Sequence, residues 1–187
     1  MEDQALDQVH LLGHSMGGKI AMTLALMVPE RIKSLTVIDI APVTYTERRH
    51  DAILKGMSSI DLTAVQKRSD AEQQMAKFEP VADVRQFLMK NLYKNSEGAF
   101  DWRVNLGSII EHYDRIMEGQ RSEAGYQGPT LFLKGGESDY LQPEHKTQVV
   151  KLFPKARVRV ISGAGHWVHA QKPELVVRSM LRFLGKR

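Results

Sequence analysis

The chain contains no cysteine among its 187 residues. This absence excludes disulfide bonds, zinc–thiolate sites and a cysteine nucleophile, and it is consistent with a cytoplasmic protein. No apolar run approaches the roughly 18 residues that a membrane-spanning helix requires, so we expect no insertion into a membrane. Residues 1–8 are acidic and polar, and we therefore expect no signal peptide there.

The chain also lacks any tract of charge of one sign. Its 26 Lys and Arg residues against 22 Asp and Glu residues give a net charge of only +4, and we predict no nucleic-acid partner. The pair Arg48-Arg49 is interpreted as a solvated surface, with contact to a CoA phosphate as the alternative. The length suffices for one globular domain with an insert, and no internal repeat is present.

The most informative motif is G-x-S-x-G at residues 13–17, which reads GHSMG. An apolar run at residues 9–12 precedes it and a helical stretch at residues 19–27 follows it. A strand, this tight turn and a helix make up the nucleophile elbow of an α/β-hydrolase. The turn strains the backbone and raises the Ser15 hydroxyl above the sheet, at the positive N-terminus of the helix.

The two outer glycines of the elbow are expected to lie where strand and helix crowd together. We predict that both Gly13 and Gly17 must lack a Cβ atom for this reason.

The pattern of apolar residues predicts an α/β core with an insert. A second strand at residues 35–40 follows the elbow helix, which Pro29 ends, and such a β-α-β unit has parallel strands. From residue 43 to about 127 the strand signals vanish and helical patterns replace them, over a length too great for a loop. We interpret residues 44–127 as a helical cap, and residues 1–43 and 128–187 as the core. The core resumes with strands at 130–133 and 156–161 and with helices at 143–153 and 173–184.

A serine nucleophile needs a base, and the base needs an acid that orients it. In this fold the three follow one another in the order Ser, Asp or Glu, His. The candidate base is His166, in a glycine-flanked loop after the last predicted strand, with His169 as the fallback. The other histidines are expected to be structural, with His14 packing beside the serine: His10, His14, His50, His112 and His145.

Two aspartates are candidates for the acid. Asp39 closes the strand after the elbow, and Asp139 follows the strand at residues 130–133. Both lie at the carboxyl edge of the predicted parallel sheet, where such sites are built. Their positions in the sequence alone do not decide whether Asp39 or Asp139 is the acid.

Extended motifs resemble those of the bacterial YbfF-type esterases and their mitochondrial abhydrolase relatives, and the resemblance covers essentially the whole chain. The matching segments are GHSMGGK at 13–19, VIDIAPV at 37–43, RRHD at 48–51 and GAGHWVHA at 163–170. The resemblance implies Asp39 as the acid, and hence a triad of Ser15, Asp39 and His166 with Asp139 as the alternative acid. It also implies hydrolysis of carboxylic esters or thioesters, including acyl-CoA, through an acyl-enzyme and without a metal or organic cofactor.

The elbow of an α/β-hydrolase normally follows several strands, but here only eight residues precede the first predicted strand. We therefore expect the N-terminal part of the core to be absent. The Met16 N–H supplies one oxyanion donor, and the second normally comes from an earlier loop. Loss of one such donor costs about 10²–10³ in kcat, so we expect these 187 residues taken alone to hydrolyse p-nitrophenyl acetate poorly or not at all. A bare apolar sheet edge also favours self-association.

Three hypotheses follow. The first is a serine esterase or thioesterase that acts on a small-molecule ester. The second is a non-catalytic fragment or subunit with the same fold. The third keeps the fold and changes the reaction, to that of a carbon–carbon bond hydrolase, a peptidase or a perhydrolase. A dehalogenase is disfavoured because its nucleophile would be an aspartate at position 15.

Overall fold

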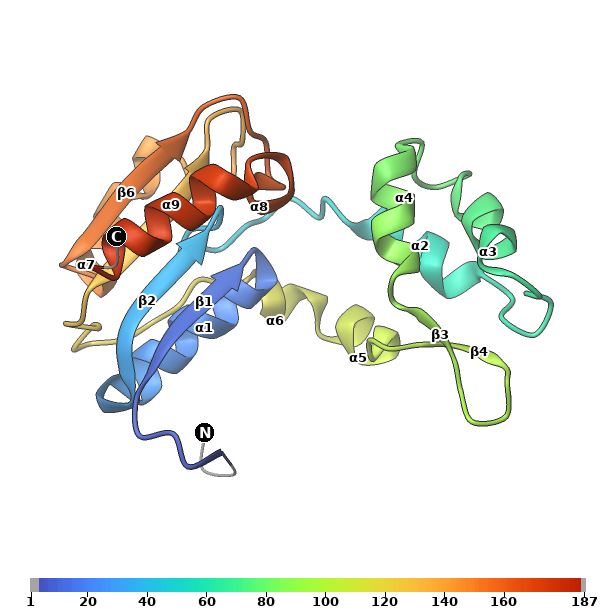
Figure 1. Ribbon diagram of the computed structural model, residues 1–187, viewed down its shortest axis with the longest axis horizontal. Helices are drawn as coiled ribbons and strands as arrows, with labels where there is room; N and C mark the ends of the chain where they lie inside the picture. The colour runs from blue at the N-terminus through green and yellow to red at the C-terminus, as the bar shows by residue number, and fades with distance from the viewer. Residues whose placement is uncertain (1–3, 186–187) are drawn as a thin grey trace. The chain divides into compact units, whose positions relative to one another are not determined.

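The computed structural model describes residues 4–185, and the chain divides into two compact units (Figure 1). The first unit comprises the residues up to Thr44 and those from Glu118 onward, and the second is Tyr45–Met117. The second unit therefore ends ahead of the predicted cap boundary at residue 127. The reason is that Tyr126 is buried in the first unit, where its hydroxyl donates a hydrogen bond to the Ile32 carbonyl at 2.8 Å.

A four-stranded sheet forms the centre of the first unit (Figure 1). Its strands, in order across the sheet, are β1 (Val9–His14), β2 (Ile32–Ile38), β5 (Thr130–Gly135) and β6 (Ala156–Ile161). Every pair of neighbours is parallel, which confirms the predicted parallel sheet. The central strands β2 and β5 are buried almost throughout, as expected for strands covered by helices on both faces.

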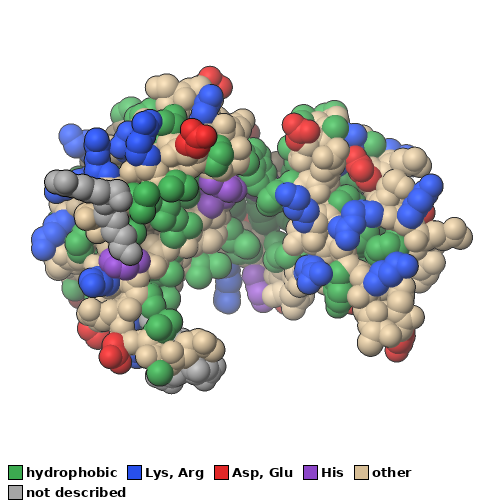
Figure 2. All heavy atoms as spheres, in the orientation of Figure 1, with side chains coloured by type: hydrophobic (Ala, Val, Ile, Leu, Met, Phe, Trp, Pro, Cys, Tyr) green, Lys and Arg blue, Asp and Glu red, His purple; other side chains and the backbone are tan. Residues whose placement is uncertain are grey.

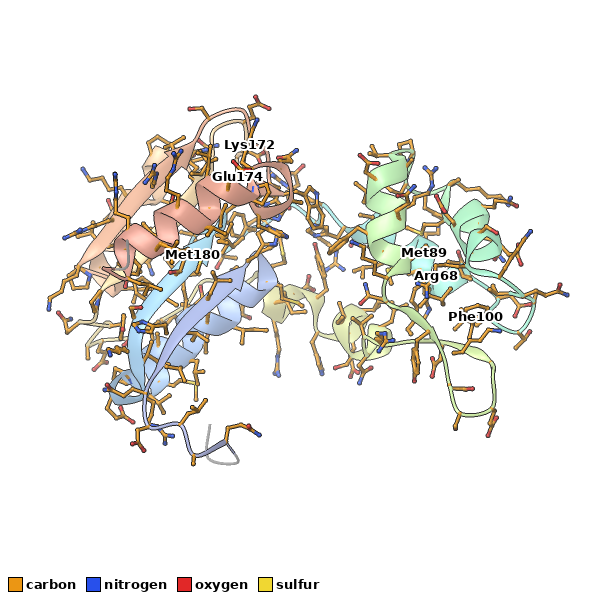
Figure 3. All side chains as sticks on the ribbon, viewed as in Figure 1. Arg68, Met89, Phe100, Lys172, Glu174 and Met180 are labelled. Carbon is orange, nitrogen blue, oxygen red and sulfur yellow. The ribbon has the colours of Figure 1, made fainter. Side chains whose placement is uncertain are left out.

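Helices cover both faces of this sheet. They are α1 (Met16–Met27), α7 (Lys146–Leu152), α8 (Val168–Gln171) and α9 (Pro173–Phe183), with the 3₁₀ turns η2 (Pro29–Arg31) and η3 (Pro143–His145). Figure 1 shows α9 on one face and α1 on the other. Leu131 and Leu133 of β5 share a core cluster with α9, which Met180 adjoins (Figure 3). The intervening Phe132 points to the opposite face, where its ring lies 5.9 Å from that of Phe153.

The second unit has a core of its own. Its elements are α2 (Asp51–Ser59), α3 (Arg68–Met75), α4 (Ala82–Met89), β3 (Leu92–Lys94), β4 (Phe100–Trp102), α5 (Leu106–Glu111) and α6 (Tyr113–Met117). Met57, Met75 and Leu92 are among its buried residues. The Arg68 guanidinium donates to the Met89 carbonyl and so joins α3 to the end of α4 (Figure 3).

The expectation that residues 43–127 contain no strand is wrong at one place. Strands β3 and β4 pair antiparallel as a separate two-stranded sheet. The side chain of Asn95 accepts hydrogen bonds from the Glu97 and Ala99 amides, both at 3.0 Å, and Gly98 takes a φ of +80°. These residues form a hairpin turn, although their composition also suits a loop between helices.

Lys19, a buried lysine of α1, lies at the point where the second unit is inserted. Its ammonium group donates to the Val43 carbonyl at 2.8 Å and to the Glu118 carbonyl at 2.5 Å. Burial lowers the pKa of Lys19 to about 8. Lys19 therefore joins the two chain segments that lead into and out of the second unit.

None of the helices between residues 4 and 185 has the length and apolarity that crossing a membrane requires.

Candidate active site

The elbow is a turn of a single residue. Strand β1 ends at His14, helix α1 begins at Met16, and Ser15 between them has φ 53° and ψ −121°. A positive φ is uncommon for a residue with a side chain and costs on the order of 1–3 kcal/mol. Two hydrogen bonds hold the strained residue, because its N–H donates to the Ile38 carbonyl and its carbonyl accepts from the Lys19 N–H, both at 3.1 Å.

Crowding in the elbow confirms one of the two glycine predictions and contradicts the other. A Cβ atom on Gly13 would lie 2.1 Å from the Gly17 carbonyl oxygen, so Gly13 has no room for a side chain. A Cβ atom on Gly17 would meet nothing within 4 Å, because the first turn of α1 directs this position outward. The second crowded glycine is Gly18, where a Cβ atom would lie 2.6 Å from Ile40 Cγ2.

Substitution of the two outer glycines therefore gives opposite expectations. Gly13→Ala forces two backbone segments apart, and overpacking of this kind costs about 2–3 kcal/mol, which lowers Tm by about 5–10 °C in a chain of this size. Gly17→Ala is expected to leave Tm unchanged or slightly higher, because alanine suits a helix better than glycine does. Thermal unfolding followed by circular dichroism measures both variants. Equal losses in the two variants would contradict the assignment of the crowded glycine.

Three predicted site residues meet at the carboxyl edge of the sheet. The imidazole of His166 lies between two partners, with Nε2 2.9 Å from Ser15 Oγ and Nδ1 2.8 Å from Asp39 Oδ2. A carboxylate only accepts, so Nδ1 carries the proton and Nε2 is left to accept from the serine hydroxyl. Asp39, His166 and Ser15 thus form one continuous chain of hydrogen bonds.

The carboxylate of Asp39 is fully buried and fully partnered. Besides His166, it accepts from the Gly135 N–H at 2.8 Å and from the Ser138 hydroxyl. A buried charge is costly unless it is paired and hydrogen-bonded, and this one has a partner on each oxygen. Asp39 also has a positive φ of 52°, so both Ser15 and Asp39 place backbone strain at the same site. Neither Gly135 nor Ser138 was predicted as a site residue, because their only signal is position: Gly135 ends strand β5, and Ser138 lies in the loop after it.

Asp139, the alternative acid, is exposed in the loop after β5. The Nδ1 nitrogen of His166 is bonded to Asp39 instead. The loop that contains Asp139 contributes to the site through Ser138, whose hydroxyl donates a hydrogen bond to the Asp39 carboxylate.

Aromatic rings surround the His166 imidazole. Tyr140 stacks on it, with ring centroids 4.0 Å apart and ring planes inclined by 25°. The ring of His14 lies 4.7 Å away, and its Nε2 is 2.8 Å from the His166 carbonyl oxygen. Burial lowers the pKa of His14 to about 4, so His14 is neutral at neutral pH. The fallback base His169 packs 4.5 Å from the His14 ring, and burial lowers its pKa as well.

Three of the remaining histidines make contacts with other residues. His10 bonds to Ser34 Oγ at 2.6 Å, and His50 bonds to the Tyr113 hydroxyl at 2.8 Å. His145 Nδ1 accepts from the Gln142 N–H. His112 is exposed at the end of α5.

Met16, the predicted oxyanion donor, is the first residue of α1. An N–H in the first turn of a helix has no partner within that helix, and the helix dipole makes this end positive. The Met16 N–H therefore has no partner within α1, and it follows Ser15 directly in the chain. Within residues 4–185, no group of three or more His, Asp and Glu side chains is arranged to hold a metal ion.

The alpha/beta hydrolase fold family matches residues 5–173. The chain belongs to the α/β-hydrolase family. It is 41% identical over 179 residues to the sn-1-specific diacylglycerol lipase ABHD11 of Mus musculus, a match that covers 93% of this chain and 58% of that protein. It is 37% identical over 184 residues to Esterase YbfF of Escherichia coli (strain K12), covering 98% of this chain and 70% of the esterase.

A solved structure extends the agreement to three dimensions. This α/β-hydrolase superposes on the structure titled "Marine microorganism esterase" with a TM-score of 0.93 and 35% identity, over 97% of this chain and 72% of that one. The predicted family and fold are therefore confirmed. The chain spans 58–70% of the length of the two curated relatives named above.

The strand order of this α/β-hydrolase explains why its site residues converge. Strands β1, β2 and β5 are neighbours and parallel, so their carboxyl ends lie together. Ser15 follows β1, Asp39 follows β2, and Ser138 lies in the loop after β5. His166 comes from the loop after β6, and the chain order Ser, Asp, His is that of the fold.

Proposed function

We propose that this α/β-hydrolase cleaves carboxylic esters through an acyl-enzyme on Ser15, with His166 as the base and Asp39 as its acid partner. The observation that carries the proposal is the unbroken hydrogen-bonded chain from Asp39 through His166 to a strained serine at the N-terminus of a helix. The names of the relatives support the substrate class, because they are esterases and a diacylglycerol lipase.

In the proposed reaction, His166 accepts and returns a proton twice, once while the acyl-enzyme forms and once while it is hydrolysed. Ser15 Oγ attacks the ester carbonyl while His166 Nε2 takes the hydroxyl proton, and the buried Asp39 carboxylate stabilises the imidazolium that forms. The Met16 N–H donates to the carbonyl oxygen as it becomes negative. His166 then returns the proton to the departing alcohol. A water molecule, deprotonated by the same imidazole, hydrolyses the acyl-enzyme and regenerates Ser15.

We propose that oxygen esters are better substrates of this chain than acyl-CoA thioesters. The pair Arg48-Arg49 was the candidate for a CoA phosphate, but nearby carboxylates balance both charges. Arg48 Nε lies 3.0 Å from both carboxylate oxygens of Asp51, and Arg49 Nε lies 2.8 Å from Glu47 Oε2. These ion pairs weaken the attraction of either arginine for a phosphate. We also propose that the second unit, Tyr45–Met117, is the helical cap of this hydrolase.

A panel of substrates tests this function. The folded chain is assayed with p-nitrophenyl esters of increasing acyl length, with acyl-CoA thioesters of matched length and with a p-nitroanilide amide, each beside Ser15→Ala. We expect oxygen esters to react fastest, thioesters more slowly and the amide not at all. Turnover of the amide above the esters would favour a peptidase. A folded chain that turns over none of them would favour a non-catalytic subunit.

We also propose that the chain associates with itself along β1, which is one of the two outer strands of the sheet. Leu12 of β1 is 43% exposed, and Ile20 and Met27 of α1 are 61% and 72% exposed. Figure 2 shows hydrophobic side chains gathered on the visible face of the first unit. A strand edge with apolar neighbours is a template for pairing with another chain.

Light scattering after size-exclusion chromatography measures this association. We expect a mass above that of the 21.2 kDa monomer, and a shift toward the monomer in Leu12→Lys. Val158→Lys on the opposite edge strand, β6, is the matched control and leaves the mass unchanged. A monomeric wild-type chain would refute the association.

A further inference from the structure

His14 occupies the variable position of the elbow motif, yet it makes a specific contact. It is the last residue of β1, and its Nε2 lies 2.8 Å from the carbonyl oxygen of His166, 152 residues away in the chain. A carbonyl oxygen only accepts, so Nε2 carries the proton. Because burial lowers the pKa of His14 to about 4, this proton belongs to a neutral ring. The contact therefore joins the nucleophile turn directly to the backbone of the proposed base.

The loop that carries His166 needs such an anchor. Residues 162–167 lie in no helix or strand, and the loop contains Gly163, with φ +66°, and Gly165. Asp39 and Tyr140 hold the imidazole ring itself. The His14 bond instead fixes the main chain from which the ring projects. Proton transfer from Ser15 depends on alignment to within about half an ångström.

The neutral state of His14 also suits its position. The two rings lie 4.7 Å apart, and the proposed reaction makes the His166 ring transiently cationic. A second cation at this distance would oppose that charge. A neutral N–H donor holds the loop without adding charge beside it.

We propose that His14 is a positioning residue, which donates its Nε2–H to the His166 carbonyl and so keeps the imidazole aligned with Ser15. The inference rests on the proposed function, because alignment matters only if His166 is the base. The chemistry requires a donor at the Nε2 position and does not require a histidine as such.

Paired substitutions separate the hydrogen bond from the packing. His14→Gln places an amide N–H close to the position of Nε2, whereas His14→Asn is one methylene shorter and does not reach the carbonyl. His14→Phe keeps the ring but has no donor. We expect kcat to fall by about 10–100-fold in the Asn and Phe variants, with KM nearly unchanged, and to stay within about fivefold of wild type in the Gln variant.

The matched control is His169→Phe. His169 belongs to the same cluster of rings, 4.5 Å from His14, but its buried Nδ1 has no hydrogen-bond partner within the described residues. We expect its kcat to stay near that of wild type. An equal loss in His169→Phe and His14→Phe would show that ring packing is what matters and would overturn the inference. An equal loss in the Gln and Asn variants, or no loss in Asn and Phe, would overturn it as well.

A second readout needs no turnover. In ¹⁵N-histidine-labelled protein, the Nδ1 proton of His166, bonded to Asp39, is expected to give one sharp resonance in wild type and in His14→Gln. We expect a shifted or broadened resonance in His14→Asn. An unchanged resonance in His14→Asn would overturn the inference even if wild type hydrolysed no ester. Inactive wild type with the expected resonances would instead refute the proposed function and leave His14 as the anchor of the loop.

Discussion

Replacing Asp39 by asparagine is expected to lower kcat for ester hydrolysis by about 10⁴-fold, with KM nearly unchanged. The Asp39 carboxylate accepts from three donors, which are His166 Nδ1, the Gly135 N–H and the Ser138 hydroxyl. An asparagine amide offers one oxygen and places an N–H against at least one of these donors. The imidazole then loses both its countercharge and the tautomer that leaves Nε2 free to accept.

Asp139→Asn is the matched control for this prediction, because it removes the same charge from an exposed position. We expect its kcat to stay within about twofold of wild type, since the Asp139 side chain is exposed and the Nδ1 nitrogen of His166 is bonded to Asp39 instead. Steady-state kinetics on a p-nitrophenyl ester compares the two variants, and the Tm of each shows that it is folded. If Asp139→Asn is the impaired variant, Asp39 is not the acid.

Removing the Ser15 hydroxyl is expected to lower kcat for ester hydrolysis by a factor on the order of 10⁵–10⁶. The reason is that the proposed acyl-enzyme cannot form without Oγ. Ser15→Ala keeps the Cβ atom, and with it the strain of a positive φ. Its Tm is therefore expected to equal that of wild type.

Ser15→Gly supplies the comparison. Glycine adopts a positive φ without strain, so this variant is expected to be equally inactive and to melt a few degrees higher than Ser15→Ala. Activity and thermal unfolding of the two variants test both parts. A kcat within about tenfold of wild type in either variant would contradict the nucleophile, and equal Tm values would contradict the strain.

The local part of the site can be predicted because it is encoded by adjacent residues. A strand, the elbow motif and a helix follow one another within residues 9–27, and β-α-β chirality then fixes the parallel sheet. This is why the fold and family predictions are confirmed. Strand ends in a parallel sheet place Ser15, His166 and both candidate aspartates at one edge, and the choice of Asp39 over Asp139 rests on the family resemblance. The catalytic roles stay predictions.

Contacts between distant segments could not be predicted in the same way. Ser138 bonds to Asp39 across 99 residues and His14 bonds to His166 across 152, and neither spacing leaves a periodic pattern. Gly17 was predicted to be crowded because the motif contains two glycines. Only the packing of α1 shows that Gly13 and Gly18 are the crowded ones. The hairpin of β3 and β4 is missed because its strands have three residues each, too few for a strand pattern.

Covalent labelling with a fluorophosphonate probe tests the central claim most directly. Trypsin releases residues 1–19 as one peptide, and Ser15 is the only serine in it. The account predicts a single adduct on this peptide in the folded chain. That adduct is absent in Ser15→Ala and in heat-denatured protein, and it forms much more slowly in Asp39→Asn. An adduct on another peptide, or a folded wild-type chain that the probe does not label, would contradict the assignment of Ser15 as an activated nucleophile.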